Sequence, residues 1–217
     1  MKLTVFGSTG RTGRCVLTEG LVRGHDVVAF TRRPQALTDV PTLAGVIHGD
    51  GRDREAVTAA VSGADAVVAI LAARSRGGPH QVAEVAHVIT DAMADVGVRR
   101  LIITSAYPVV AAKPRLPMAL LRFVFAGNYA DARAMEQHVS ASELDWTIVR
   151  LNRLTNRAPS DSVRLTPDLL DRPSAVSRAD VAASLVTLAE DGAYARTAVN
   201  LAGRGKLPAH RTPDVST

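Results

Sequence analysis

The residues with the clearest chemical potential form a glycine-rich loop near the N-terminus. The loop consists of Gly7, Ser8, Thr9, Gly10, Arg11, Thr12 and Gly13. Glycines at this spacing, between a strand and a helix, let the backbone turn tightly and approach a phosphate, and the helix start offers free N–H groups and partial positive charge. The hydroxyls of Ser8, Thr9 and Thr12 and the charge of Arg11 add further donors. We therefore predict a pyrophosphate site here; the alternative is a glycine-rich turn without a ligand.

The second group of residues follows the second apolar run of the chain. Thr31, Arg32 and Arg33 stand where a site for NAD usually has an acidic residue that accepts from the ribose 2′-hydroxyl. A guanidinium can instead pair with a 2′-phosphate and stack on adenine. We therefore expect NADP(H) to be preferred over NAD(H). The alternative is a pair of solvated arginines at the end of a strand.

Two further residues follow the next two apolar runs. Asp50 comes after the third run, where its carboxylate could accept from an adenine amino group. It could equally cap the helix that we expect from Arg52 onwards. Ala72 follows the fourth run, and a small residue there would let the backbone approach the cofactor ribose.

Short apolar runs and helical patterns alternate along the chain and must position these residues. The predicted strands are Leu3–Phe6, Asp26–Phe30, Val46–Gly49, Ala66–Leu71, Leu101–Thr104, Trp146–Val149 and Ala198–Leu201. The predicted helices are Arg11–Arg23, Arg52–Val61, Gln81–Val96, Tyr129–Ser140 and Arg178–Ala189. Strands with little alternation of polarity, separated by helices, predict an α/β fold with a doubly wound parallel sheet and right-handed crossovers.

Length and composition favour one domain. The chain has 217 residues, of which 47% are hydrophobic, so a sizeable core is available without disulfides or a structural metal. We expect a single domain over residues 1–202, with substrate-side insertions at about 108–128 and 153–176. The remaining residues, 203–217, are expected to form a flexible basic tail.

Several classes of protein are disfavoured by composition. One cysteine excludes a disulfide framework within the chain, and the six histidines show no metal-ligand spacing, so no metal site is expected. No apolar run is long enough for a signal peptide or a membrane span, which favours a cytoplasmic protein. The net charge of +5 suits anionic partners, but 4% aromatic residues offer few platforms for stacking nucleic-acid bases. We expect a small-molecule substrate, no nucleic acid or membrane partner, and a monomer or homodimer.

Several segments, in order and spacing, resemble the short-chain dehydrogenase/reductase superfamily. They are VFGSTGRTG, TRRP, HGD, IITSAY, LDWTIVR, SRADVAASLV and TAVNL. The resemblance covers about Met1–Leu201 and is to the atypical NAD(P)H-binding branch that includes flavin reductase and biliverdin reductase B-like proteins. It implies a Rossmann fold with a small C-terminal substrate cap. Members of the branch are NADPH-dependent reductases, epimerase-like proteins, or nucleotide binders without known turnover.

The resemblance also implies catalytic residues. Carbonyl-reducing members use a serine and a Tyr-x-x-x-Lys pair, in which the lysine lowers the pKa of the tyrosine. Ser105 follows the fifth predicted strand and is the candidate hydrogen-bond donor to substrate; alternatively its hydroxyl satisfies local backbone. The nearest match to the pair is Tyr129 with Arg133, and an arginine can stabilise a phenolate although it cannot be deprotonated. Alternatively, Tyr129 is a first-turn helical residue and Arg133 is exposed.

Two residues are candidates for contact with substrate. Tyr107 precedes Pro108, and we expect it to shape the pocket wall. Arg153 follows the sixth predicted strand and could grip an acidic or phosphorylated substrate, or be solvated.

Two functions remain open from the sequence. The first is an NADPH-dependent reductase that transfers a hydride to a small conjugated acceptor such as a flavin or quinone. Such transfer needs mainly positioning, and the proton can come from water. The second is a non-catalytic NADP(H)-binding redox sensor with a protein partner, favoured by the missing lysine and the basic tail.

Overall fold

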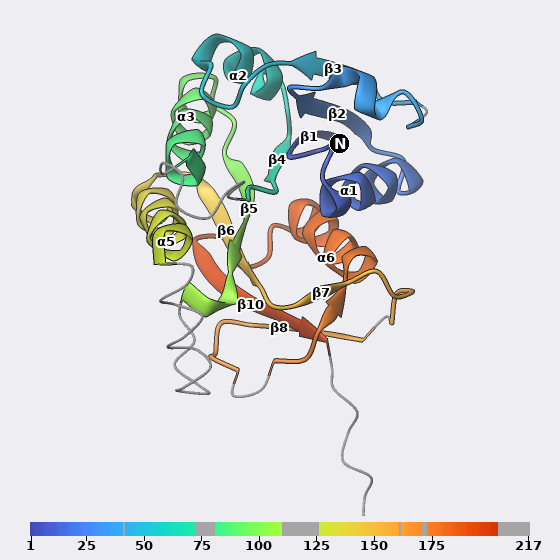
Figure 1. Cartoon of the computed structure of the whole chain (residues 1–217). Coiled ribbons are helices and arrows are strands. Elements are labelled where there is room, and N and C mark those ends of the chain that lie inside the picture. Colours follow the sequence, from blue (N-terminus) through green and yellow to red (C-terminus); the bar gives the residue numbers. More distant parts are fainter. Residues whose placement is uncertain (41, 73–80, 110–125, 161, 171–172, 204–217) are drawn as a thin grey trace, which may run out of the picture.

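A computed structural model describes residues 1–40, 42–72, 81–109, 126–160, 162–170 and 173–203, and its centre is an eight-stranded sheet (Figure 1). The strands, in spatial order, are β3 (Gly45–His48), β2 (Asp26–Thr31), β1 (Lys2–Phe6), β4 (Ala66–Ala69), β5 (Arg100–Ala106), β6 (Asp145–Leu151), β10 (Thr197–Gly203) and β8 (Val163–Thr166). All neighbours pair in parallel except β10 and β8. This order confirms the doubly wound α/β fold.

Helices cover both faces of the sheet. On one face lie α1 (Arg11–Val22) and α6 (Arg178–Asp191), and on the other lie α2 (Arg54–Val61), α3 (Gln81–Asp95) and α5 (Ala126–Ala141). A short 3-10 helix, η1 (Pro34–Leu37), follows β2, and another, η2 (Tyr107–Val109), follows β5. Each strand and helix expected from the sequence is present, within three residues of its expected bounds. None of the helices in the described ranges is both long and apolar enough to cross a membrane.

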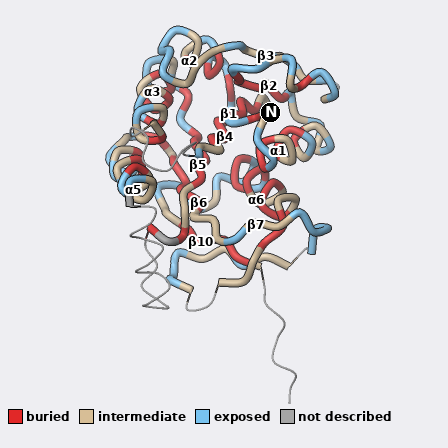
Figure 2. Tube along the Cα trace, in the orientation of Figure 1, coloured by how far each residue is buried: buried red, intermediate tan, exposed pale blue. Residues whose placement is uncertain are grey.

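The core has two layers because the strands are apolar on both faces (Figure 2). Leu3 and Val5 of β1 pack with α1 and α6, whereas Phe6 packs on the side of α2 and α3. All three side chains are buried. This two-sided burial explains the continuous apolar runs in the sequence. The parallel pairing of the strands brings their carboxyl ends to one edge of the sheet.

Helix caps set the exact starts of two helices. Asp53 accepts from the backbone N–H groups of Glu55 and Ala56 at 3.1 and 3.2 Å, so α2 begins at Arg54. The suggestion that Asp50 caps this helix is therefore wrong, because Asp53 fills that place. Ser177 caps α6 by accepting from the backbone N–H of Asp180 at 3.0 Å.

The segment at 153–176 contains strands that the sequence did not predict. It holds β8 and β7 (Leu154–Thr155), and β7 pairs with β9 (Val176–Ser177) in a second, two-stranded sheet. β10 extends to Gly203, the first residue of the expected tail; residues 204–217 lie outside the described residues. Most of the insertion expected at 108–128 also lies outside them, at 110–125.

Candidate dinucleotide site

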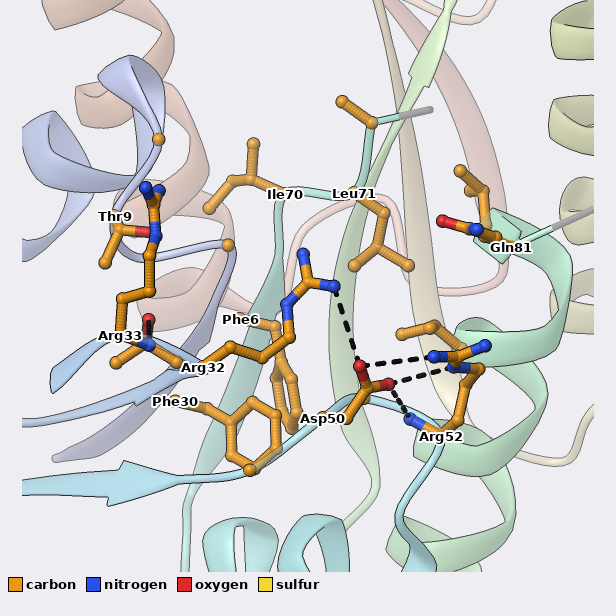
Figure 3. Close-up of a pocket in the computed structure, with 18 residues that line it drawn as sticks. Phe6, Thr9, Phe30, Arg32, Arg33, Asp50, Arg52, Ile70, Leu71 and Gln81 are labelled. Carbon is orange, nitrogen blue, oxygen red and sulfur yellow. Dashed lines mark hydrogen bonds and ion pairs between the residues drawn. The ribbon is translucent and has the colours of Figure 1, made fainter. Parts of the chain in front are cut away.

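A cavity of about 340 Å³ opens at the carboxyl ends of β1, β2, β3 and β4 (Figure 3). Its lining consists of Phe6, Gly7, Thr9, Gly10, Phe30, Thr31, Arg32, Arg33, Gly49, Asp50, Gly51, Arg52, Ile70, Leu71, Ala72, Gln81, Val82 and Val85. The chain reverses the order of strands between β1 and β4, and in open α/β sheets ligands bind at such a reversal. Eight of the twelve residues expected to bind cofactor line this cavity: Gly7, Thr9, Gly10, Thr31, Arg32, Arg33, Asp50 and Ala72.

Glycine is required at two positions of the loop that borders the cavity. Gly7 has a φ of +73°, and a Cβ there would lie 2.1 Å from the carbonyl oxygen of Ile70. A Cβ on Gly13 would lie 2.1 Å from the carbonyl oxygen of Gly7. The first glycine therefore permits the turn off β1, and Gly13 lets α1 pack closely against that turn.

The start of α1 is left open toward an anion. Its N-cap is Gly10, which supplies no capping side chain, and its first turn contains no acidic residue. Thr9 and Gly10 line the cavity directly beside this helix end. Free N–H groups and the positive end of the helix dipole therefore face the cavity, as a pyrophosphate would require.

The other loop residues serve the framework. Ser8 is buried, and its hydroxyl donates to the carbonyl oxygen of Phe30 at 2.8 Å, which ties the loop to β2. Thr12 is buried in α1. Ser8, Arg11, Thr12 and Gly13 are absent from the cavity lining, so of the three loop hydroxyls only that of Thr9 borders the cavity.

Asp50 organises the arginines on the wall of the cavity. Its carboxylate accepts from the backbone N–H and the Nε of Arg52, both at 3.0 Å, and lies 3.5 Å from the Nη1 of Arg32 (Figure 3). The hydrogen bond from the Arg52 side chain lowers the pKa of Asp50, so the carboxylate is ionised at neutral pH. Asp50 therefore draws the Arg32 guanidinium toward the cavity, although this side chain stays partly exposed to solvent. Sequence reasoning missed Arg52, although it stands two residues after Asp50.

The wall carries an excess of positive charge. Three arginines and one aspartate are the charged residues of the lining, which leaves two positive charges uncompensated. The backbone N–H of Arg33 donates to the hydroxyl of buried Thr31 at 3.0 Å, which shapes the turn that presents Arg32 and Arg33. Phe6 and Phe30, which also line the cavity, pack with ring centroids 4.7 Å apart. The cavity thus combines an apolar wall with a cationic one, a donor set that fits adenosine bearing a phosphate.

α3 is held at the edge of the cavity by a residue that sequence reasoning missed. The buried carboxylate of Asp131, on α5, accepts from the backbone N–H groups of Val82 and Ala83 at 3.0 and 2.9 Å. These are first-turn donors of α3, and Gln81 and Val82 line the cavity. No local sequence signal reveals this cap, because the two helices are far apart along the chain.

Ser105 lies near the end of β5 and is directly opposite Arg150 of β6 in the register. Its hydroxyl oxygen is buried and has no hydrogen-bond partner within the described ranges. Arg150 itself forms a buried ion pair with Glu136 of α5, at 2.7 Å. Among the described residues, the Ser105 hydroxyl therefore does not satisfy local backbone, and Ser105 is not part of the cavity lining.

The remaining candidate residues lie away from the cavity lining. Tyr129 is half-buried in the first turn of α5, and Arg133 is exposed one turn later, 3.5 Å from the carbonyl oxygen of Val109. The phenol of buried Tyr107 accepts from the backbone N–H of Leu170 at 2.9 Å and donates to its carbonyl oxygen. Tyr107 therefore fixes the 153–176 segment through its hydroxyl. Arg153 is exposed.

Comparison with known proteins adds a family to this geometry. A family model described as NAD(P)H-binding matches residues 7–192. Curated relatives from Mycobacterium bovis and Mycobacterium tuberculosis, themselves uncharacterised, are 29% identical over 97% of this chain. The chain spans only 23% of the length of these relatives.

Three solved structures share the fold. A short-chain dehydrogenase/reductase from Veillonella parvula in complex with NADP has a TM-score of 0.77 at 19% identity, with 94% of this chain and 95% of that chain covered. An anaerobillin reductase from Escherichia coli has a TM-score of 0.77 at 23% identity, with 96% and 100% covered. A candidate NADH-flavin reductase from Streptococcus pneumoniae has a TM-score of 0.79 at 18% identity, with 94% and 100% covered.

Proposed function

We propose, from the premise that this chain belongs to the NAD(P)H-binding family, that it is an NADPH-dependent reductase acting on a small conjugated acceptor such as a flavin or quinone. The observation that carries the cofactor part is the cationic wall formed by Arg32, Arg33 and Arg52 around Asp50. At this place the adenosine ribose of NAD carries a neutral 2′-hydroxyl, whereas that of NADP carries a negatively charged 2′-phosphate. Two uncompensated positive charges favour the phosphate.

The loop and the start of α1 would hold the pyrophosphate. Gly7 and Gly10 let the backbone come close to the phosphates, the first-turn N–H groups of α1 would donate to them, and Thr9 adds its hydroxyl. The adenine would lie against the apolar wall that includes Phe6 and Phe30, and Ala72 would let backbone approach a ribose. When bound, the nicotinamide supplies a hydride to the acceptor.

Ser105 is the residue that we assign to the acceptor. Its buried and unpartnered hydroxyl would donate to a carbonyl of a flavin or quinone and orient that ring. Arg150, next to Ser105 in the register, is neutralised by Glu136, so the pair offers a rigid wall rather than a free cation. This assignment needs no phenol as acid, consistent with the use of the Tyr107 hydroxyl on Leu170.

The names of the structural neighbours agree with this class of acceptor. One neighbour is an anaerobillin reductase and another a candidate NADH-flavin reductase. Bilins and flavins are both extended conjugated systems that accept a hydride at carbon or nitrogen. The likeness of these two reductases to this chain supports the class of acceptor and not a particular acceptor molecule.

The test is NADPH oxidation by the purified chain, followed by absorbance, with FMN, riboflavin, quinones, biliverdin and simple carbonyls as acceptors and NADH as the control cofactor. We expect oxidation with a conjugated acceptor, a loss of turnover in Ser105→Ala, and little change in Tyr129→Phe. Ser140→Ala, on the exposed side of α5, is the matched control.

The other outcomes decide against parts of the proposal. Turnover of carbonyls alone, abolished in Tyr129→Phe, would make Tyr129 and Arg133 the catalytic pair. Intact NADPH binding without oxidation of any acceptor would refute the reductase and favour the redox sensor that binds a protein partner.

A further inference from the structure

Three side chains with metal-binding atoms meet on the surface between α3 and α5, away from the dinucleotide cavity. His87 and Asp91 are one helical turn apart on α3, and His138 reaches them from α5. The two helices pack side by side (Figure 1). One ring nitrogen of each histidine and one carboxylate oxygen of Asp91 lie within 4.8 Å of one another.

The spacing of these atoms is close to what a zinc ion requires. Zinc binds histidine nitrogen and carboxylate oxygen at about 2.0–2.2 Å in a tetrahedron, which places neighbouring ligand atoms about 3.4 Å apart. The Nε2 of His87 lies 3.5 Å from the Oδ2 of Asp91, so this edge of the tetrahedron is already formed. His138 must approach these two atoms further to complete the triangle.

The required adjustment is a rotation of one imidazole ring. The rings of His87 and His138 are stacked, with centroids 4.0 Å apart and planes 18° apart, whereas an ion must lie in the plane of each ring that binds it. The side chain of His87 is 58% exposed, so its ring can turn about the Cβ–Cγ bond without disturbing the core. The two imidazole rings already lie side by side, and rotation of the His87 ring would let one nitrogen lone pair of each ring point at the same ion.

His138 already has the hydrogen bond that orients a metal-binding imidazole. The hydroxyl of Thr90, a buried residue of α3, donates to the carbonyl oxygen of His87 at 2.9 Å and lies 2.7 Å from the Nε2 of His138. In the tautomer with the proton on Nε2, His138 donates to this hydroxyl and its Nδ1 keeps a lone pair for an ion. Metal-binding histidines almost always donate their second N–H in this way.

A cation can bind Asp91 only if the guanidinium of Arg54 no longer pairs with this carboxylate. The Nη1 of Arg54 lies 3.5 Å from Asp91, but its Nη2 is bound to Asp95 at 2.5 Å, so Arg54 keeps a partner when Asp91 turns to an ion.

We propose that His87, Asp91 and His138 form a binding site for Zn²⁺, with water at the fourth position. This departs from the expectation of no metal site, which considered histidine spacing and not an aspartate four residues after a histidine on one helix face. Two imidazoles and a carboxylate are a donor set for zinc rather than for Mg²⁺ or Ca²⁺, which take oxygen ligands. The ion would join α3 to α5, next to the cap that Asp131 already makes between them.

The test is calorimetric titration of Zn²⁺ into the full chain without an affinity tag, after treatment with EDTA, with Mg²⁺ as the negative control ion. We expect one Zn²⁺ per chain and a rise in melting temperature with Zn²⁺, because the ion binds the folded state. His87→Gln should weaken binding about tenfold or more, since loss of an outer hydrogen bond alone costs about 10- to 100-fold. Thr90→Val removes that outer hydrogen bond and should weaken zinc binding by about 10- to 100-fold.

Two further variants make the test discriminating. Arg54→Gln removes the cation that competes for Asp91 and should tighten zinc binding, the opposite sign to His87→Gln. His48→Gln, on β3, is the matched control and should change nothing. Melting curves in EDTA check that each variant is folded. Zinc binding that survives His87→Gln in a folded chain, or no binding to the parent chain, would overturn the proposal.

Discussion

Replacement of Arg32 by glutamine should separate the two nicotinamide cofactors. The change removes the guanidinium that lies 3.5 Å from Asp50 and leaves a shorter, uncharged polar side chain. Asp50 keeps two contacts at 3.0 Å with Arg52, so the variant leaves no isolated carboxylate in the cavity. The effect therefore reports on Arg32 rather than on an exposed negative charge.

The magnitude follows from exposure. A hydrogen bond to a charged group contributes about 1.5–3 kcal/mol, and the Arg32 side chain is 48% exposed, which places it at the lower end because water screens it. A loss of about 1.5 kcal/mol corresponds to about a tenfold rise in the Kd for NADPH. NADH has no 2′-phosphate, so its Kd should change by less than about twofold.

The assay is the Kd of each cofactor, measured at one ionic strength because the contact is electrostatic and screened by salt. Arg164→Gln, on β8 at the other edge of the sheet, is the matched control for the loss of one positive charge. An equal loss of affinity for NADPH and NADH would refute the reasoning, since Arg32 would then contact a group that both cofactors share.

Three further changes test the framework. Gly13→Ala places a Cβ against the Gly7 carbonyl and should abolish cofactor binding or sharply lower the melting temperature; an unaltered Kd and melting temperature would contradict the close packing. Tyr107→Phe leaves both backbone groups of Leu170 without the phenol and should lower the free energy of unfolding by about 1–2 kcal/mol in urea titrations, whereas no loss would mean that water replaces both bonds. Because the pKa of His138 is lowered in the folded state, the unfolded chain binds more protons below its usual value of 6.5. The free energy of unfolding should therefore fall as pH drops below 6.5, and this slope should shrink in His138→Gln.

Part of the cavity lining could be predicted from the sequence because its signals are local. These residues follow the ends of neighbouring strands, and parallel strands bring their carboxyl ends to one edge. Gly7 after β1, Arg32 after β2 and Asp50 after β3 thus meet by topology alone. Even here the sequence did not reveal which side chains pair. Asp50 contacts Arg52 and Arg32 because of the rotamers that these side chains adopt, and the spacing of residues does not determine rotamers.

Features that depend on contacts between distant segments escaped prediction. β8 is a short strand of mixed polarity, and its pairing with β10 supplies the order that its sequence lacks. The cap of α3 comes from Asp131, on another helix, and so leaves no signature at the start of α3. The cap of α2 could have been read, because Asp53 stands directly before the helix, but Asp50 offered the same side chain three residues earlier.

The two ends of the proposed site are therefore built by different means, and this has a functional consequence. In the proposed function, cofactor choice would rest on Arg32 and its neighbours after β2 and β3, whereas Ser105 lies opposite Arg150 of β6, which pairs with Glu136 of α5. No residue of the arginine wall contacts the Arg150–Glu136 pair among the interactions described. Substitutions after β2 should thus alter the preference between NADPH and NADH while leaving the choice of acceptor unchanged. Substitutions of Glu136 on α5 should do the reverse, because Glu136 pairs with Arg150 opposite Ser105 and does not line the cavity.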